Sequence, residues 1–194
     1  MTRGRLEAFS DGVLAIIITI MVLELHAPHA ADVENLKPLW PGLLSYVLSF
    51  IYVGIYWNNH HHLFHAVQRV TGMTLWANLH LLFWLSLLPA STSWMGQTHF
   101  APQPVFAYGL NLLMCAIAWT LLCMVLVHHH GRESVLAKAI YRDPKQIASL
   151  LLYATALALA FAQPVVSSVL YLVVAALWFV PDRRIERILN AREK

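Results

Sequence analysis

The amino-acid sequence predicts an all-α integral membrane protein that forms a single domain over residues 1–194. Hydrophobic residues make up 59% of the chain and charged residues only 12%, whereas a soluble domain contains about 25% charged residues. Apolar segments of membrane-spanning length recur along the chain, and the lysines and arginines fall between them. The net charge of +3 therefore bears on membrane topology and not on nucleic-acid binding.

Six apolar segments are expected to be transmembrane helices, since about 20 helical residues cross a bilayer core. Pro89 favours a kink within the third segment, and the prolines at 102 and 104 predict a loop over 96–104. The link Gln163–Pro164 is so short that the last two helices should form a tight hairpin. The expected spans are approximately 4–26, 36–65, 72–95, 105–128, 146–162 and 165–181.

The positions of the basic residues predict how these spans are oriented in the membrane. Twelve of the 13 lysines and arginines lie in the N-terminus, the second-to-third turn, the fourth-to-fifth connector and the C-terminal tail. Only Lys37 falls on the other side. Because positive charge is retained on the cytoplasmic face, six spans with both termini in the cytoplasm fit this pattern best.

The first segment is the least suited to face lipid. Its uncharged centre runs only from Gly12 to Leu23, with Asp11 on one side and Glu24 on the other. Charge at membrane depth is expensive unless it faces protein or water. We therefore expect this helix to lie inside a bundle.

Helical periodicity sorts the faces of this first helix. Ser10 and Asp11 point roughly opposite to Ile16, and Thr19 lies on the flank of the Ile16 side. An aliphatic side of this kind packs in a core, against a symmetric partner, or around a narrow pore; periodicity alone leaves all three open. The residues that share it are Phe9, Val13, Ile16, Ile20 and Leu23.

Polar residues of three helices should lie at one depth. Ser10 and Asp11 lie near the start of the first helix, Asn59 to His61 near the end of the second, and Trp76 to Asn78 near the start of the third. Buried polar groups need hydrogen-bond partners. We therefore predict an interhelical polar network in this layer.

Three motifs resemble those of the transmembrane protein 175 family of lysosomal and endosomal potassium channels. The first helix carries Arg5, Phe9-Ser10-Asp11-Gly12-Val13, Ala15-Ile16 and Thr19. The second carries Trp-x-Asn-His-His-x-Leu-Phe from Trp57, and the third Trp-x-Asn-Leu-x-Leu-Leu-Phe from Trp76. No long internal repeat is evident, so the chain is similar to the single-repeat bacterial members.

This resemblance implies a homotetramer whose first helices line a central pore and conduct K+ passively across a bacterial cytoplasmic membrane, with no cofactor and no enzymatic activity. The pore and its constriction would be formed by Ile16, Thr19, Ile20 and Leu23. The pore helix would be locked to its neighbours by a structural network of Arg5, Phe9, Ser10, Asp11, Asn59, His60, His61, Trp76 and Asn78. The expected partners are potassium ions, the lipid bilayer and other copies of the chain.

Two other functions fit parts of the sequence. His61, His62 and His65 have helical metal-ligand spacing, and His128–His130 form a second cluster of unassigned role, which would suit a metal-dependent membrane enzyme. A third histidine box is missing, so we expect no metal site. A proton-coupled transporter is the other alternative, although transporters often show internal repeats. The sequence contains no Thr-Val-Gly-Tyr-Gly segment, which forms the backbone-carbonyl selectivity filter of many potassium channels. Any ion selectivity must therefore arise from other groups.

Overall fold

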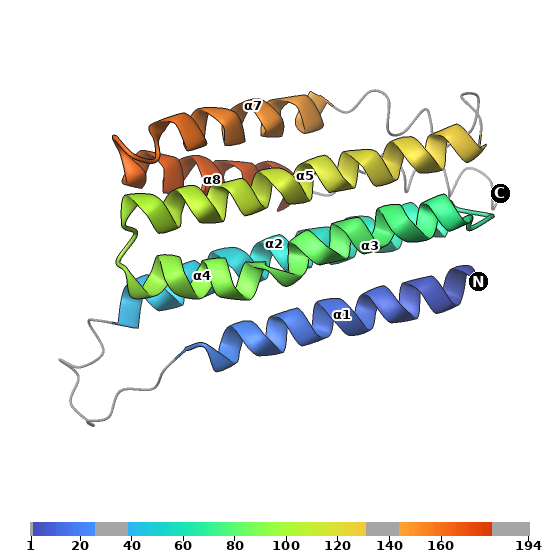
Figure 1. Ribbon diagram of the computed structural model, residues 1–194, viewed down its shortest axis with the longest axis horizontal. Helices are drawn as coiled ribbons and strands as arrows, with labels where there is room; N and C mark the ends of the chain where they lie inside the picture. Colours follow the sequence, from blue (N-terminus) through green and yellow to red (C-terminus); the bar gives the residue numbers. More distant parts are fainter. Residues whose placement is uncertain (1, 26–38, 131–143, 180–194) are drawn as a thin grey trace.

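The computed structural model describes residues 2–25, 39–130 and 144–179. Its helices lie side by side along the long axis of the molecule and alternate in direction (Figure 1), so that the described part makes six passes. The helices are α1 (Arg3–Leu23), α2 (Trp40–His65), α3 (Gly72–Ser86), α4 (Leu88–Gln97), α5 (Pro102–His130), α7 (Pro144–Leu159) and α8 (Pro164–Phe179).

These helices form a layered bundle with α1 at one edge. α1 packs mainly against α2, α3 and α4, while α5 lies between α3 and α7, and α8 pairs with α7. In Figure 1, α1 and α7 lie at opposite edges of the bundle. The first helix is therefore covered by its own chain on one side only.

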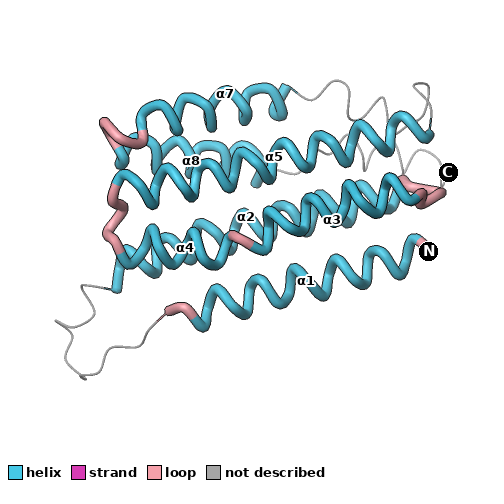
Figure 2. Tube along the Cα trace, viewed as in Figure 1, coloured by secondary structure: helices cyan, strands magenta, loops and turns pink. Residues whose placement is uncertain are grey.

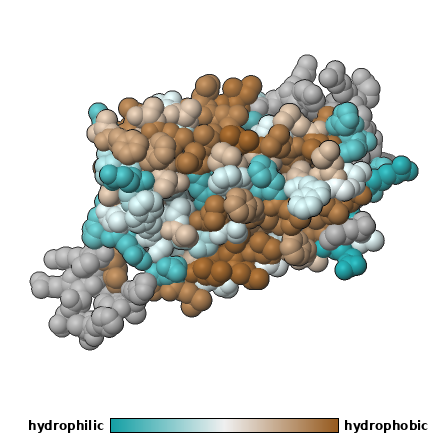
Figure 3. Space-filling view, in the orientation of Figure 1, coloured by the Kyte–Doolittle hydropathy of each residue, from teal (hydrophilic) through white to brown (hydrophobic). Residues whose placement is uncertain are grey.

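Length and composition make most of this bundle suitable for a bilayer. Four of the described helices are long and apolar enough to cross a membrane if α3 and α4 are counted as one span, and α8 is a shorter apolar helix. Figure 3 shows apolar surface over α1 and α7, with hydrophilic residues gathered mainly towards the two ends of the helices.

The third span is interrupted close to Pro89, where the sequence predicts a kink. α3 ends at Ser86 and α4 begins at Leu88, with the interruption visible as a short loop in Figure 2. Pro89 lies in the first turn of α4. It has no N–H to donate to the preceding turn, and its ring crowds that turn's carbonyl groups. The two halves therefore meet at a kink.

The expected loop over 96–104 is shorter than predicted. α4 continues to Gln97, and α5 already begins at Pro102. The prolines at 102 and 104 thus lie in the first turn of a helix instead of a loop. Proline is favoured there because the first N–H groups of a helix have no partner within it.

The final hairpin is confirmed. α7 ends at Leu159 and α8 begins at Pro164, with the N–H of Gln163 donating to the Leu159 carbonyl at 2.7 Å. The Ser167 hydroxyl donates to the carbonyl of Ala156 at 2.7 Å, which ties the two helices together. Lys37 and most of the basic connectors used to orient the spans lie outside the described residues.

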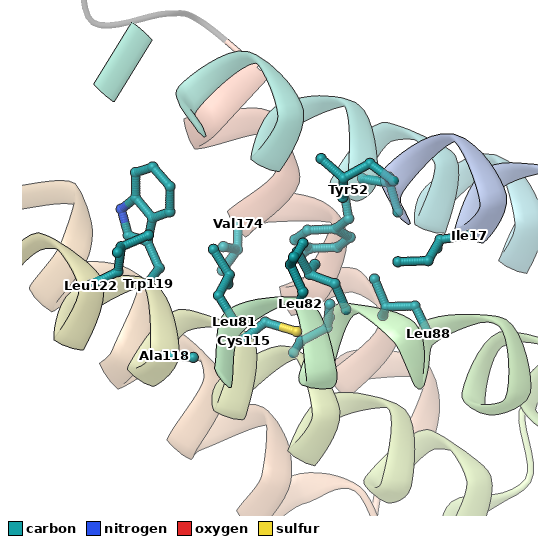
Figure 4. Packing of buried hydrophobic residues seen from close by; sticks show 14 of the residues in the cluster. Ile17, Tyr52, Leu81, Leu82, Leu88, Cys115, Ala118, Trp119, Leu122 and Val174 are labelled. Atoms are coloured by element: carbon teal, nitrogen blue, oxygen red, sulfur yellow. The ribbon is translucent and has the colours of Figure 1, made fainter. Parts of the chain in front are cut away.

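Buried tyrosines link the second helix to the last three. The Tyr52 hydroxyl donates to the Tyr171 carbonyl at 2.6 Å and accepts from the Tyr153 hydroxyl at 3.2 Å. The Tyr171 hydroxyl donates to the Val105 carbonyl at 3.2 Å. These bonds satisfy polar groups inside an apolar core, which Figure 4 shows to be built from several helices, with Ile17 and Leu82 among its members.

Candidate functional site

The side of α1 that carries the predicted pore residues is exposed in the single chain. Ile16 is 58% exposed, Ile20 43% and Leu23 78%, and Thr19 is exposed beside them. We call these four residues the α1 stripe. The opposing packing surface of the helix consists of Leu6, Ser10, Leu14, Ile17 and Met21, all buried.

The α1 stripe contains one polar group, the hydroxyl of Thr19. Thr19 donates its hydroxyl proton to the carbonyl of Ile16 at 2.8 Å. This bond satisfies the hydroxyl donor within the helix, while the hydroxyl oxygen keeps the capacity to accept. The stripe therefore presents aliphatic side chains together with one oxygen acceptor.

Charged groups share the exposed side of α1. Asp11 is exposed and accepts a hydrogen bond at 3.1 Å from Nε1 of Trp57, which is itself 48% exposed. Glu24, just beyond the far end of the helix, is also exposed. Lipid solvates such groups poorly. Protein or water must therefore cover this side of α1 in the membrane.

A buried polar relay fastens α1 to α2 and α3. Nε2 of His60 donates to Oδ1 of Asn78 at 2.8 Å, and Nδ2 of Asn78 donates to Oγ of Ser10 at 3.0 Å. The Ser10 hydroxyl donates in turn to the carbonyl of Leu6 at 2.9 Å. An amide oxygen only accepts, so the imidazole must carry its proton on Nε2. All three side chains are almost completely buried.

The other members of the predicted network take no part in this relay. Trp76 is 74% exposed and Phe9 48%, and Arg5 and His61 are also exposed. Asn59 lines a different cavity, between α2, α5, α7 and α8. The structure thus joins Ser10, His60 and Asn78 in one relay, and joins Asp11 to Trp57 separately.

Sequence reasoning missed the partner of Asp11. Trp57 opens the second-helix motif but is not a member of the predicted network. Helical spacing carried the signal, because Trp57, His60 and Phe64 recur at intervals of three and four residues and so share one face of α2. Asn59 lies about 100° from His60 on the same helix.

The histidine clusters form no metal centre in the described part of the chain. No group of three or more His, Cys, Asp or Glu side chains is placed there to hold a metal ion. His61 and His65 lie side by side, with ring centroids 4.7 Å apart. His128 and His129 are exposed at the end of α5.

The sequence of this chain is similar to those of potassium channels. A family model described as endosomal/lysosomal potassium channel TMEM175 matches residues 5–89. A potassium channel of Chryseobacterium sp. (strain P1-3) is 54% identical over 190 residues, covering 98% of this chain and 99% of that protein.

Similarity extends to a solved structure and to animal proteins. The crystal structure of a lysosomal potassium-selective channel TMEM175 homolog from Chamaesiphon minutus matches with a TM-score of 0.77 and 30% identity, covering 91% of this chain and 95% of that one. The human endosomal/lysosomal proton channel TMEM175 is 33% identical over 117 residues, covering 54% of this chain and 23% of the human protein. The chain therefore shares an all-helical channel fold.

Proposed function

Because the chain belongs to the TMEM175 family, we propose that it forms a potassium-selective channel that conducts K+ passively across the membrane. It uses no cofactor and catalyses no reaction, and K+ is the permeant ion. The whole chain, residues 1–194, forms one channel domain. The single observation that carries this proposal is the exposed side of α1, which combines an aliphatic stripe with charged groups at both ends.

The exposed side of α1 supports assembly around a central axis. Lipid alone would accept Ile16, Ile20 and Leu23, but it would not accept the charged Asp11 and Glu24, which are exposed as well. Four copies arranged with α1 innermost cover this side with protein and with the water of a pore. The homotetramer places lipid against the outer helices.

The α1 stripe forms the constriction of this pore. Rings of branched aliphatic side chains close a pore to hydrated ions by dewetting. Ile16 and Ile20 give two such rings about 6 Å apart along the axis, and Leu23 gives a third. The Thr19 hydroxyl oxygen faces the passing cation between them.

The polar relay holds the pore helix in register. Ser10 supplies the side chain of α1 in this relay, and Asn78 bridges it to His60 on α2. Asp11 adds a second tie to α2 through Trp57. The same layer includes Arg5, Phe9, Asn59, His61 and Trp76, which contribute to packing between helices and between subunits.

The channel resides in the cytoplasmic membrane of a bacterial cell with both termini in the cytoplasm. The start of α1, the end of α2 and the start of α3 lie at one end of the bundle, together with the end of α5 (Figure 1). Arg3, Arg5 and Arg69 occupy this end. Retention of positive charge supports its cytoplasmic assignment.

Ion flux from liposomes tests this function. Purified protein is reconstituted into vesicles loaded with K+, and a proton ionophore supplies the counter-charge. We expect K+ to leave down its gradient, much faster than Na+ leaves matched Na+-loaded vesicles, without any imposed proton gradient. If no K+ efflux occurs under these conditions and efflux appears only when a proton gradient is imposed, the protein is a proton-coupled transporter instead.

The animal relatives make proton conduction the second candidate, since the human protein is named a proton channel. The same vesicles carry a pH-sensitive dye, and the ionophore is omitted. Acidification of the lumen driven by K+ efflux would then show that the channel itself admits protons. Protein-free vesicles give the leak rate for both measurements.

A further inference from the structure

A carboxylate is held in a defined position beyond the far end of α1. Glu24 accepts a hydrogen bond at 2.8 Å from the hydroxyl of Ser93 on α4. Ser93 in turn accepts one at 2.8 Å from Nε2 of Gln97, one helical turn further along α4. The Gln97 amide occupies an accepting position of the hydroxyl, so the hydroxyl proton is directed to Glu24. This arrangement suits an ionised carboxylate.

The same carboxylate borders the α1 stripe. Glu24 and Ile20 line one open cleft of about 460 Å³ together with Ser93 and Gln97. Leu23, the residue before Glu24 and the last of the stripe, is 78% exposed. The carboxylate therefore lies at the end of the stripe that is remote from the His60 relay.

From this arrangement, and resting on the proposed channel function, we propose that Glu24 attracts cations to the outer mouth of the pore. Four symmetry-related carboxylates form a ring of negative charge just outside Leu23. The ring raises the local K+ concentration and thereby the rate at which ions enter from outside. Ser93 and Gln97 are positioning residues that keep each carboxylate beside the stripe.

Such a ring acts through its field and not through direct coordination, so its effect depends on salt. The Debye length is about 30 Å at 0.01 M ionic strength and about 3 Å at 1 M. A charge near the mouth therefore concentrates cations in dilute KCl and is screened in concentrated KCl. It also acts on ions entering from its own side. A merely structural role of Glu24 would show neither dependence.

Single-channel recording of Glu24→Gln in planar bilayers tests the proposal. The substitution keeps a similar shape and removes one charge per subunit. In symmetric KCl of about 0.02 M we expect inward conductance to fall about twofold or more, and outward conductance to fall less. In about 1 M KCl the variant and the unmodified channel should conduct alike.

Glu7→Gln is the matched control. It also removes one carboxylate per subunit, but at the opposite end of α1, where Glu7 pairs with Arg3 at 3.2 Å. Inward conductance in dilute KCl should be unchanged by this substitution. The double variant Glu24→Gln/Ser93→Asp returns a carboxylate to the same cleft and should restore inward conductance.

Three results would overturn the role of Glu24: an unchanged inward conductance in dilute KCl, an equal loss at both salt concentrations, or an equal loss in both directions. If Glu24→Gln fails to assemble, Ser93→Lys tests the same charge with Glu24 in place, and an unchanged inward conductance would again contradict the proposal. An unmodified protein that passes no K+ would refute the channel function itself. The two failures are thus distinguishable.

Discussion

Ile16→Asn should convert the proposed constriction into a hydrated one. Ile16 is 58% exposed in the single chain, so most of its side chain lies outside the packing of its own subunit. In the proposed tetramer the substitution places four amides in one ring. Each amide offers water a donor and an acceptor where the isoleucine offers neither, so water should enter the ring more readily.

The expected increase in flux follows from the hydrogen bonds that the amides supply. A net hydrogen bond contributes about 0.5–1.5 kcal/mol. Four amides at the lower value would lower the barrier to a hydrated ion by about 2 kcal/mol, which corresponds to an increase of about 30-fold. Potassium preference should decrease as well, because a hydrated ring no longer strips water from the passing ion.

Ile17→Asn is the matched control on the same helix. Ile17 is only 2% exposed and lies in the core of its own subunit, about 100° around the helix from Ile16. The substitution removes a packed side chain and buries an amide, which should cost about 2–5 kcal/mol of stability. Flux through the tetramers that survive should stay close to that of the unmodified channel.

Liposome flux and tetramer stability are measured for both variants. The pore assignment predicts stable, leaky and less selective tetramers for Ile16→Asn, and unstable tetramers of normal flux for Ile17→Asn. Folded Ile16→Asn tetramers with unchanged flux and unchanged selectivity would refute the assignment of Ile16 to the pore. Unfolding of Ile16→Asn without any leak would instead indicate that Ile16 belongs to a packed core.

Three further substitutions test the packing around the pore helix. Asp11→Ala removes the acceptor on the exposed side of α1 and should shift the tetramer to smaller species on size exclusion; a variant that stays tetrameric and loses only selectivity would make Asp11 an ion ligand. Asn78→Leu leaves the buried Ser10 hydroxyl without its donor and should lower the free energy of unfolding by about 1–3 kcal/mol, so an unchanged melting temperature would contradict the relay. Gly96→Ala brings a methyl group within 2.7 Å of the Gly42 Cα and should lower the melting temperature by forcing α2 and α4 apart, whereas normal stability would show that the two helices separate freely.

Helical periodicity predicted the faces of α1 because it depends on one helix alone. Ile16, Ile20 and Leu23 were assigned to one side from their spacing, and the structure places all three on the exposed side. The spacing predicts that Ser10 and Asp11 both point away from this stripe; Ser10 is buried, whereas Asp11 is exposed and contacts only Trp57 among the hydrogen bonds of the described residues. The choice between a core and a pore did not follow from spacing, because it depends on what lies opposite the stripe.

The polar layer was predictable in its depth but not in its pairings. Antiparallel neighbouring helices share their two ends, so residues near the start of one helix and near the end of the next lie at one level, and Ser10, His60 and Asn78 are expected to meet. Which side of α2 faces α1 depends on how α2 is rotated about its own axis. That rotation brings Trp57 to Asp11 and turns Asn59 towards α7.

The sequence by itself determined the helical class, the approximate spans and the sides of α1, since hydropathy and periodicity are local properties of the chain. The tertiary structure alone decided that Asn78 bridges Ser10 to His60 and that Ser93 holds Glu24. Ser93 lies 69 residues from Glu24 in the chain. No local pattern relates such distant positions, because their contact arises only when every intervening helix has packed.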